Sequence, residues 1–80
     1  MQMASLSELD LAALQIELPA YGLIAGDIGT VVHVYDQGAA YEVEFVRADG
    51  RTLAVETLRA DQIEPVAGQQ VLHARKLTPA

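Results

Sequence analysis

The sequence contains no cysteine and no tryptophan, and its aromatic side chains are limited to three tyrosines and one phenylalanine. The absence of cysteine excludes disulfide bonds and thiolate zinc sites as sources of stability. A chain of 80 residues is therefore one domain that depends on its apolar core. Because alanine, leucine and valine make up most of the 51% hydrophobic residues, we expect a compact core of small side chains.

Basic residues are also scarce, with five lysines and arginines against eleven aspartates and glutamates and a net charge of −6. Eleven acidic residues and three arginines lie at or before Glu64, which gives this part a charge of −8, whereas Arg75 and Lys76 give the remainder +2. Such a surface repels phosphate backbones, so nucleic-acid binding is disfavoured.

Long apolar runs are lacking too. Charge or glycine interrupts every apolar stretch well before the about 18 residues that a membrane span requires. The amino-terminal segment has no basic region ahead of an apolar run, which argues against a secretory signal. We therefore expect a cytoplasmic protein with no membrane contact.

The most specific feature of the chain is the segment YGLIAGDIGTVVHVY, from Tyr21 to Tyr35. A glycine-rich turn runs directly into β-branched residues, which suit a pleated, half-buried strand. This pattern predicts a small β-barrel. The residues to which we assign structural roles in turns are Gly22, Gly26, Asp27, Gly29 and, in a later hairpin, Gly50.

We predict an all-β fold, a small five-stranded SH3-like barrel with strands at residues 10–16, 28–35, 40–47, 51–57 and around Ile63. A single helical turn is expected over residues 58–62, and residues 1–65 form the barrel domain with 66–80 as a C-terminal extension or tail. The sequence leaves two alternatives for the first element, a strand or a helix. Ser5 and Glu8 have capping-box spacing, so a helix over residues 5–15 is nearly as well supported as the strand. We favour the strand because a five-stranded barrel needs it.

The hairpin at residues 48–50 is predicted to have a three-residue loop with Gly50 in the left-handed conformation. This loop pairs Phe45 with Leu53 and Val43 with Val55. The alternative pairing of Val43 with Glu56 places an acid on the core face, and a slip of one residue exchanges the two faces of a strand. We therefore predict that Glu56 lies outside.

A four-residue loop at 36–39 sets the preceding hairpin. Its predicted pairs are Val34 with Tyr41, Val32 with Val43 and Thr30 with Phe45. The predicted inner face of the sheet comprises Val32, Val34, Tyr41, Val43, Phe45, Leu53 and Val55.

On the outer face the same registers place His33 opposite Glu42 and Glu42 opposite Glu56, with Glu44 two residues further along. An imidazole and carboxylates are potential metal ligands, and paired carboxylates can perform acid–base catalysis. A flat, solvated strand surface neither excludes water nor fixes such groups, so we expect no metal, no cofactor and no enzymatic activity. We interpret His33, Glu42, Glu44 and Glu56 as a partner-binding face.

Several segments carry a family resemblance: YGL at 21–23, GDIGTVV at 26–32, YEVEF at 41–45, DGR at 49–51 and TL at 57–58. Together they resemble a bacterial family of small stand-alone proteins known as a domain of unknown function, over roughly residues 9–65. The resemblance implies an SH3-like barrel, similar in outline to the nitrile hydratase β-subunit domain and to ribosomal KOW modules. It implies no activity, ligand or catalytic residue.

Two functions follow as hypotheses. The first is a non-enzymatic protein-binding module, the acidic antitoxin-like or immunity-like partner of a basic protein. The alternative is a KOW-like nucleic-acid or ribosome-associated module that uses Tyr35, Tyr41 and the cations of its tail. The first and fifth strands are expected to be exposed edges, and such edges invite pairing, so a homodimer also stays open.

Overall fold

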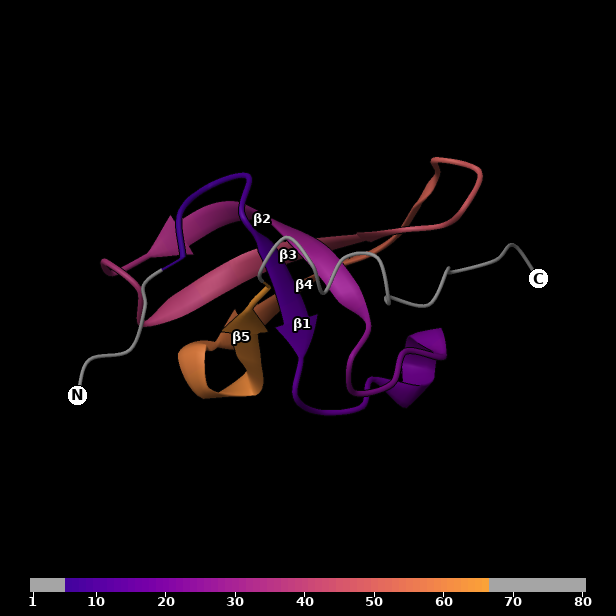
Figure 1. Ribbon diagram of the computed structural model, residues 1–80, viewed down its shortest axis with the longest axis horizontal. Helices are drawn as coiled ribbons and strands as arrows, with labels where there is room; N and C mark the ends of the chain where they lie inside the picture. The colour runs from indigo at the N-terminus through magenta and orange to yellow at the C-terminus, as the bar shows by residue number, and fades with distance from the viewer. Residues whose placement is uncertain (1–5, 67–80) are drawn as a thin grey trace.

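The computed structural model describes residues 6–66, and these residues form one antiparallel sheet. The sheet contains the strands β1 (Leu11–Leu14), β2 (Ile28–Tyr35), β3 (Ala40–Val46), β4 (Thr52–Arg59) and β5 (Ile63–Pro65). Two short 3-10 turns, η1 (Pro19–Tyr21) and η2 (Ala60–Gln62), complete the described fold. Figure 1 shows the hairpin between β3 and β4 projecting at the upper right, away from β1 and β5. The predicted all-β fold class is confirmed.

The strand order is β4-β3-β2-β1-β5, so the sheet is bent but not closed by strand pairing. Its edges are β4 and β5. The prediction that the first strand forms an edge is wrong, because β1 pairs with β2 on one side and with β5 on the other. The fifth strand is an edge as expected.

The first element is a strand, which resolves the alternative that the sequence left open. Among the described residues, 6–10 form no helix. Asp10 instead closes a turn: its carboxylate accepts the Ser7 N–H at 2.8 Å and its own N–H donates to the Ser7 carbonyl at 3.0 Å. The segment from Ser7 to Asp10 therefore forms a turn that leads into β1. The expected extension at 66–80 lies, apart from Val66, outside the described residues.

The core lies on the concave face of the sheet. Its fully buried side chains include Phe45 and Val43 from β3, Val31 from β2, and Leu14 and Leu23 from the amino-terminal half. Tyr41, Leu58 and Ile63 pack around them. Alanines 12, 13 and 54 are also buried, so the core consists largely of small side chains, as the composition indicates.

The β3–β4 hairpin confirms the predicted loop but not the predicted register. Gly50 has φ of +89°, and the Arg47 N–H donates to the Arg51 carbonyl across the three-residue loop. A β-bulge then inserts Leu53 between the Val46–Thr52 pair and the Phe45–Ala54 pair. Beyond it every pair is shifted by one residue, so the predicted pairs Phe45 with Leu53 and Val43 with Val55 are wrong. Val43 pairs with Glu56 instead.

The β2–β3 hairpin shows the same behaviour. The four-residue loop at 36–39 is confirmed, as is the predicted pairing of Val34 with Tyr41 and of His33 with Glu42. A second β-bulge at Val32 then shifts the register, so Val31 pairs with Val43 and Thr30 pairs with Glu44. The predicted pairs Val32 with Val43 and Thr30 with Phe45 are wrong. Bulges increase the local twist of a strand, and here one flanks β3 on each side.

These shifts change the composition of the core. Val32 and Val55 were expected inside, but they are 38% and 44% exposed. Val31 and Ala54 take their places in the interior. Val34 and Leu53 are partly buried and pack against the core, and Tyr41, Val43 and Phe45 are buried as predicted.

Val43 and Val55 provide a matched test of the β3–β4 register. The sequence-based register places both in the core, whereas the structure buries Val43 completely and exposes Val55. Val43→Ala should lower the free energy of unfolding by about 2 kcal/mol, and Val55→Ala should change it by less than about 0.5 kcal/mol. Urea denaturation of both variants measures the difference. Equal losses would contradict the bulge at Leu53.

Candidate functional site

The convex side of the sheet carries a group of polar side chains that we call the acidic face: His33, Tyr35, Glu42, Glu44 and Thr57. They share one side because directly opposed residues of antiparallel strands point the same way. His33 is opposed to Glu42, and Glu42 is opposed to Thr57, so the cluster crosses β2, β3 and β4. The two expected neighbours His33 and Glu42 are therefore brought together.

Glu42 is the centre of this face. Its Oε1 atom accepts hydrogen bonds from the Tyr35 hydroxyl at 2.7 Å and from the Thr57 hydroxyl at 3.0 Å. The bond from Tyr35 lowers the pKa of Glu42 most, followed by the bond from Thr57, because both donors stabilise the ionised carboxylate. Glu42 is thus a fixed negative charge at neutral pH.

The same contact acts on the tyrosine in the opposite direction. Ionised Glu42 accepts the phenolic hydrogen bond, which raises the pKa of Tyr35 and keeps it protonated. The Tyr35 ring also contacts His33 edge to face, with ring centroids 4.5 Å apart. On its other side, His33 Nδ1 lies 3.9 Å from a carboxylate oxygen of Glu8.

Glu44 is oriented by a separate contact. The Thr52 hydroxyl donates to its carboxylate across the β3–β4 pair. Thr30 and Val55 are its directly opposed neighbours on β2 and β4. Each glutamate of the acidic face is therefore held by a threonine hydroxyl of β4.

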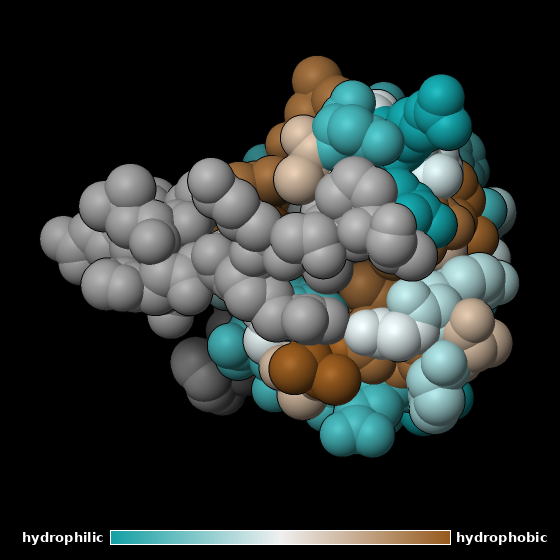
Figure 2. Space-filling view, turned by 90° about the vertical axis from the view of Figure 1, so that its right-hand side faces the viewer, coloured by the Kyte–Doolittle hydropathy of each residue, from teal (hydrophilic) through white to brown (hydrophobic). Residues whose placement is uncertain are grey.

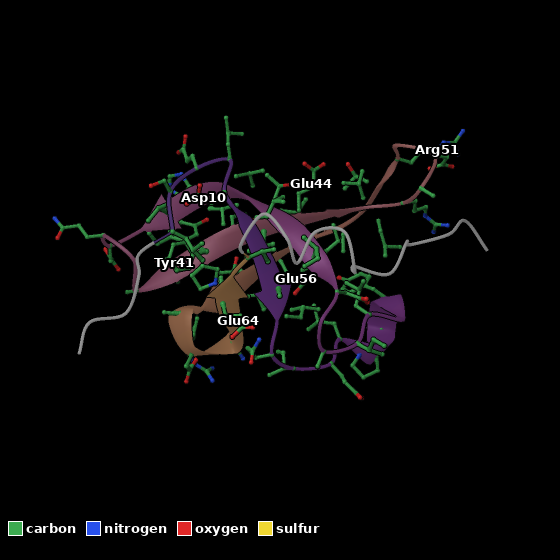
Figure 3. All side chains as sticks on the ribbon, viewed as in Figure 1. Asp10, Tyr41, Glu44, Arg51, Glu56 and Glu64 are labelled. Atoms are coloured by element: carbon green, nitrogen blue, oxygen red, sulfur yellow. The ribbon has the colours of Figure 1, made fainter. Side chains whose placement is uncertain are left out.

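Glu56 was expected on this face, and that prediction is wrong. It is opposed to the fully buried Val43 and so lies on the concave side, half-buried. Figure 3 shows labelled Glu44 above the sheet and labelled Glu56 below it. A hydrogen bond with Glu56 raises the pKa of Tyr21 at the end of η1. The acid that the sequence analysis excluded from the inner face is accommodated there because a tyrosine of the η1 turn reaches it.

The residues assigned to turns lie where the chain reverses or passes close to another strand. Gly22 and Gly26 have positive φ in the connection from β1 to β2. Asp27 is 1% exposed, and its carboxylate accepts the Ile24 N–H at 2.9 Å within that connection. Gly29 lies in β2, where it passes β3 closely. These residues have structural roles in positioning the strands, so the acidic face is the candidate site for binding.

No group of three or more His, Cys, Asp or Glu side chains within residues 6–66 is arranged to hold a metal ion. No helix among those residues is long and apolar enough to cross a bilayer. Figure 2 looks onto the side that bears η1 and the β3–β4 hairpin, where apolar and polar residues are interspersed.

The sequence pattern indicated His33, Glu42 and Glu44 as members of the face but did not indicate the hydroxyl groups of Tyr35, Thr52 and Thr57. The hydrogen bonds from Thr52 and Thr57 depend on the β3–β4 register, which the bulge at Leu53 sets. Thr52 and Thr57 are five residues apart, so a regular strand would place them on opposite faces, and the bulge at Leu53 brings them to the same one.

Removal of the two donors should raise the pKa of Glu42 toward its ordinary value of 4.5. We expect this in Tyr35→Phe/Thr57→Val, measured by NMR titration of the side-chain carboxyl. Thr52→Val is the control, because Thr52 bonds Glu44 rather than Glu42 and its loss should leave the pKa of Glu42 unchanged.

The lowered pKa of Glu42 also predicts that the stability of the protein depends on pH. A carboxyl with a lowered folded-state pKa contributes stability above its unfolded-state pKa, and the contribution is lost as pH falls through the folded-state value. The wild type should therefore lose more stability than the double variant when the pH is lowered from neutrality to below 4.5. An unchanged Glu42 pKa in the double variant would contradict the hydrogen-bond account.

One protein-family model matches the whole region of the chain that forms the sheet. The family model described as "Domain of unknown function (DUF4926)" matches residues 8–65. Comparisons with curated proteins and with solved structures found no match. The matched region begins just before β1 and ends with β5, so it includes all five strands and the acidic face. The chain belongs to the DUF4926 family of domains of unknown function.

Proposed function

We propose that this protein is a non-enzymatic binding module that recognises a basic protein partner through its acidic face. The observation that carries the proposal is the preorganisation of Glu42 by Tyr35 and Thr57. Hydrogen bonds that hold a carboxylate in one orientation reduce the entropy that binding would otherwise cost. A partner cation then meets an oriented negative charge.

The charge of the whole chain supports the same proposal. A net charge of −6 favours encounter with a positively charged protein and slows encounter with another polyanion. Such a relation suits an antitoxin-like or immunity-like protein that neutralises a basic partner. We also propose that the protein is bacterial and cytoplasmic and that its sheet is that of an SH3-like barrel.

The KOW-like alternative loses one of its two aromatic residues. This alternative uses Tyr41 to contact nucleic acid, but Tyr41 is 3% exposed and packs in the core. Its hydroxyl accepts the Leu6 N–H at 3.3 Å. Tyr35 is exposed, yet its hydroxyl is engaged by the Glu42 carboxylate, which repels phosphate.

A pair of matched charge reversals tests the proposal. Glu42→Lys/Glu44→Lys reverses the acidic face, whereas Glu17→Lys/Glu64→Lys makes the same change in net charge at exposed sites outside it. Immobilised wild type and both variants should be exposed to extract of the native host, with and without nuclease. The captured proteins are then quantified by mass spectrometry and their net charges compared.

We expect the wild type to capture a basic, nuclease-insensitive protein. The acidic-face variant should retain roughly tenfold less of it, and raised salt should weaken capture. The control variant should resemble the wild type. If both variants lose the captured protein equally, net charge alone explains the binding. If the wild type captures more RNA than the acidic-face variant does, the KOW-like nucleic-acid function is favoured.

A further inference from the structure

The two edges of the sheet differ in how open they are to another strand. β5 has three residues and ends at Pro65, which has no N–H to donate. β4 has eight residues and contains neither proline nor lysine, two residues that commonly protect edges. β4 is therefore the longer edge of the described sheet, and it is open between the bulge at Leu53 and Arg59.

The hydrogen-bond pattern shows which backbone groups of β4 point outward. The Ala60 N–H donates to the Ala39 carbonyl at 3.4 Å, which makes the adjacent pair Ala40–Arg59 a non-hydrogen-bonded pair. Pair types alternate along an antiparallel ladder. Thr57 and Val55 therefore also belong to non-hydrogen-bonded pairs, and their N–H and C=O groups point away from β3.

These outward groups have no backbone partner among residues 6–66. The edge ends at Arg59, where the N–H donates to the Gln62 side chain at 2.8 Å. Between the bulge at Leu53 and this cap, Val55 and Thr57 offer two donors and two acceptors in strand geometry. Exposed Val55 adds an apolar contact beside them.

We propose, building on the function proposed above, that the basic partner binds by adding an extended strand to the β4 edge. Backbone hydrogen bonds to Val55 and Thr57 would fix the strand, as in other complexes formed by strand addition. Lysine or arginine side chains on its convex side would reach over β4 toward Glu42 and Glu44. An added strand lies about 10 Å from β3, a span that a long cation and a glutamate bridge together.

Charge decides between a basic strand and a second copy of this chain. Two copies paired through β4 would bring together two sheets, and in each copy the residues up to Glu64 include eleven acidic residues and only three arginines. The cation on β4 itself, Arg59, already pairs with Asp61 at 3.1 Å. A second copy therefore brings repulsion where a basic strand brings attraction.

The probe for this proposal is a blocked peptide of about ten residues that alternates lysine and valine, which is long enough to lie along all eight residues of β4. Two sibling peptides serve as controls. One replaces every lysine with glutamate, and the other carries N-methyl groups on alternate residues, which remove the donors along one edge but keep the side chains. Binding is followed by NMR shifts and by hydrogen exchange of the Val55 and Thr57 amides.

We expect the lysine peptide to slow exchange of both amides roughly tenfold or more at saturation. The glutamate peptide should not bind, and the N-methylated peptide should bind more weakly without protecting these amides. Val55→Pro removes an outward N–H that β3 does not use, so it should keep the fold and weaken binding of the lysine peptide. Val55→Thr, which keeps the N–H, should bind as the wild type does.

Three results would overturn strand addition. The first is that the lysine and N-methylated peptides bind equally well, that Glu42→Lys/Glu44→Lys weakens the binding of both, and that neither protects the two amides. The acidic face would then still recognise a basic partner, but without an added strand. The second is protection of both amides in the free protein that increases with concentration, which would identify a second copy. The third is protection independent of concentration, which would show that the chain itself covers the edge.

Discussion

The close approach of β2 to β3 at Gly29 is the constraint on which the rest of the structure depends. A Cβ atom at this position would lie 2.6 Å from Val43 Cγ1, 2.8 Å from Phe45 Cε1 and 2.9 Å from the Glu44 carbonyl oxygen. Glycine is thus required by space at Gly29, whereas Gly50 is required by its positive φ. On its other side Gly29 pairs with Ala12 of β1, which is also small and buried. The small residues let three strands pack closely over Phe45.

This packing also determines the acidic face. With Val43 and Phe45 facing the concave core, Glu42 and Glu44 of the same strand face the convex side because strand residues alternate. The bulges at Val32 and Leu53 then decide which side chains of β2 and β4 stand beside them. Thr57 rather than Glu56 meets Glu42, so a hydroxyl donor replaces what would have been a repelling carboxylate. The chemistry of the face therefore follows from the register.

The sequence predicted the strands and their turns well and the registers only in part. β-branched residues and flanking turns located Ile28–Tyr35, and the glycine of the hairpin predicted the left-handed Gly50. The bulges carried no comparable signal, since Val31 and Val32 have identical side chains and either suits the core. The side chosen for Glu56 failed for a different reason, because the compensating contact comes from Tyr21, which lies 35 residues earlier in the chain.

The most direct test of this account is a comparison of Gly29→Ala with Gly50→Ala by urea denaturation. At Gly50 a Cβ atom meets open space, so the cost is that of a left-handed backbone, about 1–2 kcal/mol. At Gly29 the added methyl group meets side chains and backbone of β3, and overpacking should cost about 3 kcal/mol. The account predicts that Gly29→Ala is the more destabilised protein. A Gly29→Ala protein as stable as the wild type would show that neither the core nor the acidic face depends on this close approach.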